Sequence, residues 1–174
     1  MNKLAHNLVY LCGPIDCAKD GGMEWRKNIT PELKRMKLGV LDPTNKPSFD
    51  NAEDHFFRDR IQLLKKEGKY EEVRTIMHNV VGFDLRMVDA ATFLILKVDP
   101  TIHMCGSYFE CTYAIQQHKP ILTFCDSGIN SLPNWLYGCI PYKYFFNSLN
   151  EVLGYIRCIN EGLIKPDSKW KFFD

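Results

Sequence analysis

Short runs of β-favouring apolar residues alternate with segments of helical periodicity along most of this chain. The most apolar run, Phe93-Leu94-Ile95-Leu96-Lys97-Val98, is typical of a strand buried on both faces at the centre of a parallel sheet. Shorter runs at 8–11, 39–41 and 121–124 indicate further strands. Parallel strands need long crossover connections, which are usually helices, so the alternation predicts a single doubly wound α/β domain.

Proline and glycine residues mark breaks in the helical segments between the strands. A first helix is predicted over 24–36, where Pro31 indicates a kink or a restart with Thr30 as cap. The segment from 52 to about 89 predicts two helices separated at Gly68. We expect one domain over 1–174, with a helical insertion at about 52–80.

Charge and cysteine usage exclude several classes of protein. The 22 basic and 21 acidic residues leave a formal charge of +1, so no nucleic-acid polymer is expected as a partner. No run approaches the ~20 apolar residues of a membrane span, and the polar first residues do not resemble a signal peptide, so we expect a cytoplasmic protein without membrane contact. The 7 cysteines include no Cys-x-x-Cys pair and the 5 histidines are scattered. We therefore expect no disulfide framework, no metal and no other cofactor.

The run Cys105-Gly106-Ser107-Tyr108-Phe109-Glu110 follows the predicted central strand. It predicts a tight turn through Gly106 and a helix over 108–118 that begins at Ser107. Ser107-x-x-Glu110 fits a capping box, which would make Glu110 a structural residue in the first helical turn. Ligands of parallel α/β sheets bind at the carboxyl ends of the strands, so Glu110 is equally well placed for chemistry.

Asp84 is the second carboxylate of interest. It shares the helical spacing of Val80 and Val88, so it lies on the apolar stripe of its predicted helix. An unpaired buried carboxylate is costly, and Asp84 should therefore be paired, hydrogen-bonded or turned towards a polar cleft.

These motifs, in this order, resemble the nucleoside 2-deoxyribosyltransferase family. The resemblance begins with Tyr10-Leu11-Cys12-Gly13-Pro14-Ile15, Trp25-Arg26 and Val40-Leu41-Asp42-Pro43. It continues with Asp84-Leu85, the strand at 93–98, Gly106-Ser107-x-x-Glu110-x-x-x-Ala114 and Lys119-Pro120-Ile121. The match covers about residues 8–125, and the last fifty residues match poorly.

The resemblance implies a flavodoxin-like fold with a mainly parallel five-stranded sheet, and cleavage of the bond between a base and 2-deoxyribose. It makes Glu110 the nucleophile and gives Asp84 the task of protonating the leaving base or positioning the sugar. A carboxylate can capture the oxocarbenium-like carbon as an ester while a second acid protonates the base. The resemblance also implies a homo-oligomer. The residues expected to bind the substrate are Tyr10, Cys12, Gly13, Pro14, Ile15, Asp16, Arg26, Gly106 and Ser107.

The acceptor and the substrate class stay open at this point. The sugar can pass to another base or to water, and the substrate can be a deoxynucleoside or its 5′-monophosphate. A phosphate would need amides and a cation, which the segment 16–22 and Arg26 could supply. Two other classes also remain: an NAD-type N-glycosidase, and a noncatalytic nucleotide-binding module that uses Glu110 only as a cap.

Overall fold

The computed structural model describes residues 2–46 and 55–171. Its centre is a sheet of five strands in the order β2-β1-β3-β4-β5, and every neighbouring pair is parallel. The strands are β1 (Leu8–Cys12), β2 (Gly39–Leu41), β3 (Phe93–Lys97), β4 (Ile121–Phe124) and β5 (Phe145–Phe146). This order is that of the flavodoxin-like doubly wound fold, so the predicted fold class is confirmed. The four strands predicted from apolar runs are present, and β5 is a two-residue addition at the edge.

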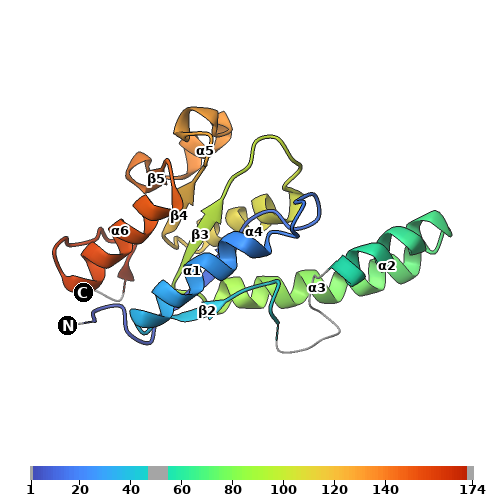
Figure 1. Cartoon of the computed structure of the whole chain (residues 1–174), viewed down its shortest axis with the longest axis horizontal. Helices are drawn as coiled ribbons and strands as arrows, with labels where there is room; N and C mark the ends of the chain where they lie inside the picture. Colours follow the sequence, from blue (N-terminus) through green and yellow to red (C-terminus); the bar gives the residue numbers. More distant parts are fainter. Residues whose placement is uncertain (1, 47–54, 172–174) are drawn as a thin grey trace.

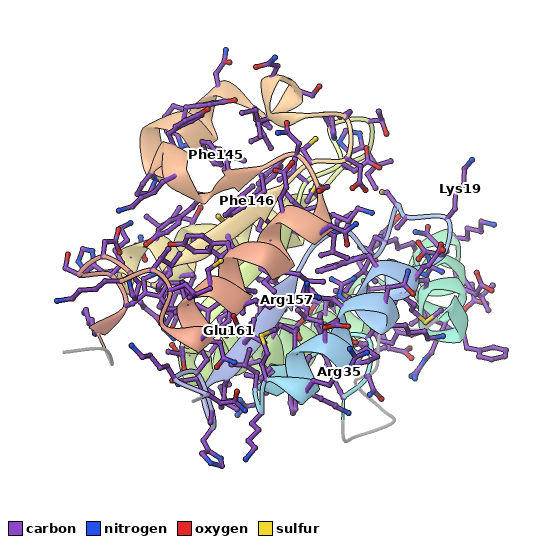
Figure 2. The ribbon with its side chains drawn as sticks, turned by 60° about the vertical axis from the view of Figure 1, so that its left-hand side comes forward. Lys19, Arg35, Phe145, Phe146, Arg157 and Glu161 are labelled. Carbon is purple, nitrogen blue, oxygen red and sulfur yellow. The ribbon has the colours of Figure 1, made fainter. Side chains whose placement is uncertain are left out.

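Helices cover both faces of the sheet in three layers (Figure 1). On one face α1 (Met23–Arg35) packs beside α6 (Leu149–Glu161), and Arg157 of α6 pairs with Glu32 of α1 at 3.0 Å. Figure 2 shows Arg157 on the side of α6 that faces α1. The other face carries α3 (Tyr70–Ala90) and α4 (Cys105–Gln116), which contact each other and β1. The short elements η2 (Ile129–Ser131), α5 (Asn134–Cys139) and η3 (Tyr142–Tyr144) connect β4 to β5.

The pleat of β1 decides which of its side chains reach the functional face. Successive side chains of a strand point to opposite faces, so Val9 and Leu11 share one face while Tyr10 and Cys12 share the other. All four are fully buried. Tyr10 and Cys12 lie on the face that carries α3 and α4, since Cys12 contacts residues of α4.

Pro31 neither ends nor restarts the first helix. The helix α1 is continuous from Met23 to Arg35 with Pro31 inside it, so the expected restart with Thr30 as cap is wrong. The Thr30 hydroxyl instead donates to the Arg26 carbonyl at 2.7 Å. Burial of Ile29 and Leu33 against the sheet outweighs the one hydrogen bond that proline removes.

The predicted break at Gly68 is confirmed. The helix α2 (His55–Lys66) ends before it and α3 begins at Tyr70, while Gly68 has the left-handed φ of 72° that favours glycine. The predicted start at 52 lies outside the described residues. Figure 1 shows α2 and the first part of α3 extending away from the sheet. That this segment is an insertion stays a prediction.

The C-terminal segment is held against the sheet by an aromatic contact. Trp170 is buried with its ring centroid 4.9 Å from that of Phe93, and its indole N–H donates to the Tyr144 hydroxyl at 3.0 Å. The predicted cap of α6 is confirmed, because Ser148 Oγ accepts from the Glu151 amide at 3.3 Å. None of the described helices is long and apolar enough to cross a membrane.

Candidate active site

A cleft of about 450 Å³ opens at the carboxyl edge of the sheet. Its walls are the loop after β1, the inner face of α3 and the first two turns of α4. The chain leaves β1 for a helix on one face and leaves β3 for a helix on the other, so the cleft lies at the topological switch point between them. In doubly wound sheets this is where ligands bind.

Glu110 enters this cleft from the second turn of α4. The helix begins at Cys105 with Met104 as its N-cap, and the Tyr108 amide already donates to the Met104 carbonyl at 3.0 Å. The predicted start at Ser107 is therefore wrong, and so is the capping box that would have made Glu110 a structural residue. Glu110 is half-buried and lines the cleft. Because Glu110 lies beyond the first turn, the free amides of the helix start give its charge little support.

Gly106 and Ser107 lie inside the same helix, one turn before Glu110. The expected tight turn at Gly106 is absent, because its backbone is helical and its φ is not positive. Within 2–46 and 55–171, no atom beyond its own stretch of α4 lies within 4 Å of where a Cβ at Gly106 would be. Both residues line the cleft, and Ser107 is buried; their contact with substrate stays a prediction.

Cys12 lies behind Glu110 at the end of β1. Its thiol donates to Oε2 of Glu110 at 3.2 Å and is also 3.4 Å from the Ser107 carbonyl oxygen. Burial and then the negative charge of Glu110 raise the pKa of this thiol well above its usual value, so it stays a protonated donor. Among the described residues, Cys12 does not line the cleft itself. It lies one layer behind the lining and contacts Glu110.

Tyr10 lies beneath both carboxylates. Burial raises the pKa of its hydroxyl well above the usual value, and the negative charges of Glu110 and Asp84 raise it further. Glu110 of α4 and Asp84 of α3 line the same cleft, at the end of the strand that carries Tyr10. Tyr10 is fully buried and supports the floor of the site rather than its open surface.

Asp84 is buried on the inner face of α3 and lines the cleft. Its Oδ1 lies 2.8 Å from Nζ of Lys46, whose side chain is 0% exposed. Lys46 belongs to the loop after β2, and its Nζ is also 5.8 Å from the centroid of the Phe83 ring. The expectation that a buried Asp84 would be paired is confirmed. Lys46 itself was missed, and its place near the carboxyl end of a parallel strand was the available signal.

The remaining residues predicted to bind substrate lie either in the loop after β1 or beneath it. Gly13, Pro14, Ile15 and Asp16 line the cleft, as predicted. Arg26 is 0% exposed and lies beneath the loop, where its guanidinium donates to three carbonyl oxygens: Leu11 at 3.2 Å, Gly22 at 2.6 Å and Gly13 at 2.9 Å.

Three hydrogen bonds of the guanidinium are thus made inside the protein, and substrate binding by Arg26 stays a prediction. Its Nε is also 3.6 Å from Oδ1 of Asp42.

A Cβ at Gly22 would lie 2.1 Å from the Pro14 carbonyl oxygen, so only glycine permits this close packing of the loop on α1.

The phosphate cradle expected over 16–22 is occupied by the protein itself. The Asp20 carboxylate accepts from the amides of Gly22 at 3.0 Å and Glu24 at 2.8 Å, at the start of α1. Figure 2 shows Lys19 pointing away from the body of the molecule. Arg58 of α2 donates to the carbonyls of Ile15 and Ala18 and so fixes the loop to α2.

The lining of the cleft is rich in carboxylates. Asp16, Asp84 and Glu110 line it, and His103 is the only basic side chain among the described lining residues. The apolar part of the lining comes mainly from α3, through Met77, Val80, Val81 and Leu85. Sequence reasoning missed this wall, although it continues the apolar stripe that contains Asp84. Within 2–46 and 55–171, no group of three His, Cys, Asp or Glu side chains is arranged to hold a metal ion.

Comparison with known proteins gives a likeness of fold. No protein-family model matches the chain, and no curated protein matches it by sequence. Among solved structures it is similar to the 2-deoxyribosyltransferase of Bacillus psychrosaccharolyticus, with a TM-score of 0.52 and 18% identity. The alignment covers 85% of this chain and 91% of that one. At this level of identity, the comparison establishes a shared flavodoxin-like fold.

Proposed function

We propose that this protein cleaves the N-glycosidic bond of 2′-deoxynucleosides through a covalent ester on Glu110. The observation that carries the proposal is the placement of Glu110, which faces a cleft at the switch point and receives a hydrogen bond from the Cys12 thiol. With the helix start at Cys105, capping no longer explains this glutamate. The fold is also that of an enzyme described as a 2-deoxyribosyltransferase.

The reaction has two displacement steps at the anomeric carbon. An oxygen of Glu110 bonds to this carbon as the carbon–nitrogen bond breaks, and the electron pair of that bond leaves with the base nitrogen, which takes up a proton. Water or a nitrogen of a second base then attacks the same carbon and loses a proton. The electron pair of the ester bond returns to Glu110, which is regenerated as a carboxylate.

The surroundings of the cleft suit a nucleoside. The apolar wall of α3 offers a surface for a flat base, while Asp84 and Glu110 supply acceptors for the sugar hydroxyls. Lys46 offsets the charge of Asp84, but Asp16 and Glu110 beside a single histidine still disfavour the dianionic phosphate of a 5′-monophosphate. We therefore propose deoxynucleosides as substrates, with a second base or water as acceptor, and a homo-oligomer as the assembled form.

The test is base release by wild type and Glu110→Ala from a panel of deoxynucleosides, deoxynucleoside 5′-monophosphates and NAD. Loss of the nucleophile should lower release by about a thousandfold or more. Glu71→Ala, in the exposed first turn of α3, is the matched control and should release base as wild type does. A 2-fluoro-arabino nucleoside should leave a sugar adduct on the peptide that contains Glu110, seen by mass spectrometry.

Other outcomes identify the other classes of protein. A wild-type protein that binds nucleosides but releases no base would be a binding module. Release confined to NAD or ribonucleotides would exclude the deoxyribosyl reaction. Light scattering measures the mass in solution, and a single-chain mass would contradict the homo-oligomer.

A further inference from the structure

The buried ion pair between Lys46 and Asp84 has a consequence for the proton that the leaving base needs. Asp84 faces the cleft, whereas Lys46 lies behind it with its side chain fully buried. An ammonium 2.8 Å from a carboxylate in a poorly solvated site strongly favours the ionised form of that carboxylate. An ionised aspartate can accept hydrogen bonds but has no proton of its own to give.

We propose that Lys46 is a positioning residue that keeps Asp84 ionised, so that Asp84 accepts a hydrogen bond from the substrate instead of protonating the base. This inference rests on the proposed N-glycosidase function. In this arrangement Asp84 accepts a hydrogen bond from a sugar hydroxyl or from a base N–H. The proton for the departing nitrogen then comes from water, which reaches the cleft past the exposed side chains of Asp16 and Cys105.

The geometry around Lys46 supports a charged, fixed ammonium. The face of the Phe83 ring lies 5.8 Å from Nζ, which adds a favourable contact for a cation. A buried lysine without an anion would be costly, so the ion pair fixes the loop after β2 against α3 as well as fixing Asp84. Both partners are needed, and the removal of either leaves the other as a buried charge.

Other charged and titratable groups line the same cleft as Asp84 or lie beneath it. They come from β1, from the loop after it and from the start of α4: Tyr10, Cys12, Asp16, Cys17, His103, Cys105 and Glu110. Of these, Glu110 and Asp16 are acidic and would push a proton onto Asp84 if Lys46 were absent. Tyr10 and Cys12 stay neutral because burial raises the pKa of each well above its usual value. Among the described residues, Lys46 is therefore the cation that opposes protonation of Asp84 most directly.

Three variants separate this role from a merely structural one. Lys46→Met removes the charge at nearly constant length, Lys46→Arg keeps the charge, and Lys66→Met on the exposed end of α2 is the control. For each protein, kcat/KM for base release is measured from about pH 5 to pH 9. In parallel, the carboxyl carbon of Asp84 is titrated by NMR in protein labelled with ¹³C-aspartate, with Asp84→Asn to assign the signal.

We expect the Asp84 signal of wild type to remain that of a carboxylate throughout this range. In Lys46→Met, Asp84 should take up a proton within the range, and kcat/KM should fall by about tenfold or more at the acidic end and recover as the pH rises. Lys46→Arg should keep the wild-type pH profile, and Lys66→Met should keep both profile and rate.

Two results would overturn the proposal. One is a wild-type Asp84 that carries a proton near neutral pH, with a rate that falls as this proton is lost, because Asp84 would then be the acid. The other is a Lys46→Met protein with the rate and pH profile of wild type. The NMR titration of wild type decides the first point even if Lys46→Met does not fold. It also needs no activity, so a protein that releases no base would refute the proposed function while the state of Asp84 is still measured.

Discussion

The thiol of Cys12, at the end of β1, donates a hydrogen bond of 3.2 Å to Oε2 of Glu110 on α4. The contact joins the first strand of the sheet to the proposed nucleophile, across a sequence separation of 98 residues. Because Cys12 is fully buried, this hydrogen bond holds the carboxylate from inside the protein.

Replacing Cys12 with alanine should slow base release while the fold is kept. The lost hydrogen bond is worth about 1 kcal/mol, which corresponds to a roughly fivefold lower kcat. Cys12→Ser retains a donor of similar size and should stay closer to wild type. Steady-state kinetics on both variants measure the effect, and equal rates for Cys12→Ala and wild type would show that the thiol does not position Glu110.

Arg26 should matter for stability rather than for substrate affinity. Its removal leaves the carbonyls of Leu11, Gly13 and Gly22 without their donor, so Arg26→Met should lose about 3–5 kcal/mol of unfolding free energy. For a domain of this size, the melting temperature should fall by about 6–15 °C. Arg35→Met is the control, because Arg35 is 71% exposed and pairs only at the surface. A stable Arg26→Met protein with a raised KM would instead support the contact with substrate that the sequence suggested.

The cysteines of the site should differ sharply in their reaction with iodoacetamide. Cys17 and Cys105 are exposed and line the cleft, whereas Cys111 is buried. Burial raises the pKa of Cys111 to about 12, so almost no reactive thiolate is present at about pH 8.5. Peptide mass spectrometry should find Cys17 and Cys105 modified first, with loss of activity and protection by a bound nucleoside. Early modification of Cys111 would contradict the burial of that side chain.

Acid should destabilise the C-terminal segment through Asp167. Burial alone would raise the pKa of this carboxyl, but hydrogen bonds from Lys143 and Tyr144 outweigh burial and lower it overall. A lowered folded-state pKa stabilises the protein above the unfolded value of about 4, and this contribution is lost as the pH falls further. Asp167→Asn should lose about 1 kcal/mol at neutral pH and much less near about pH 3. Urea unfolding at the two pH values measures the difference, and an equal loss at both would contradict the role of the charge.

A 5′-phosphate on the substrate should lower kcat/KM for base release. Because the described lining of the cleft holds Asp16, Asp84 and Glu110 but no lysine or arginine, a deoxynucleoside should have a higher kcat/KM than its 5′-monophosphate. The amides at the start of α4 offer a phosphate only a modest compensation, of about 1 kcal/mol. Competition between the two substrates in one reaction gives the ratio directly. A preference for the monophosphate would show that a cation outside the described lining reaches the phosphate.

The parts of the fold that sequence could predict are those with a local signal. Strands such as β3 follow from uninterrupted apolar runs, and the break at Gly68 follows from a residue that tolerates a positive φ. The start of α4 did not follow, because Ser107-x-x-Glu110 matches a cap while the helix begins at Cys105, with Met104 as an N-cap that makes no side-chain hydrogen bond. A pattern of four residues cannot tell a helix start from the turn after it.

The ion pair of the candidate site shows a second limit. The apolar spacing around Asp84 predicted that this carboxylate needs a partner, but Lys46 lies 38 residues away in a polar loop with no pattern of its own. Only the order of the strands brings these two residues together. The place of Arg26 also depends on the tertiary fold. The pair Trp25-Arg26 suggested a motif, but Arg26 is buried under the loop because α1 packs against β1.

Gly106 places a limit on how far this protein can be made more stable. Alanine inside a helix is favoured over glycine by up to about 1 kcal/mol, and no atom of the residues that the structure describes would obstruct the added methyl group. That methyl group would nevertheless project from the same helix face as Glu110, into the space where a sugar must approach. An alanine at this position would therefore stabilise α4 while it narrows the approach to Glu110. The position records a compromise between a sturdier helix and an open path to the nucleophile.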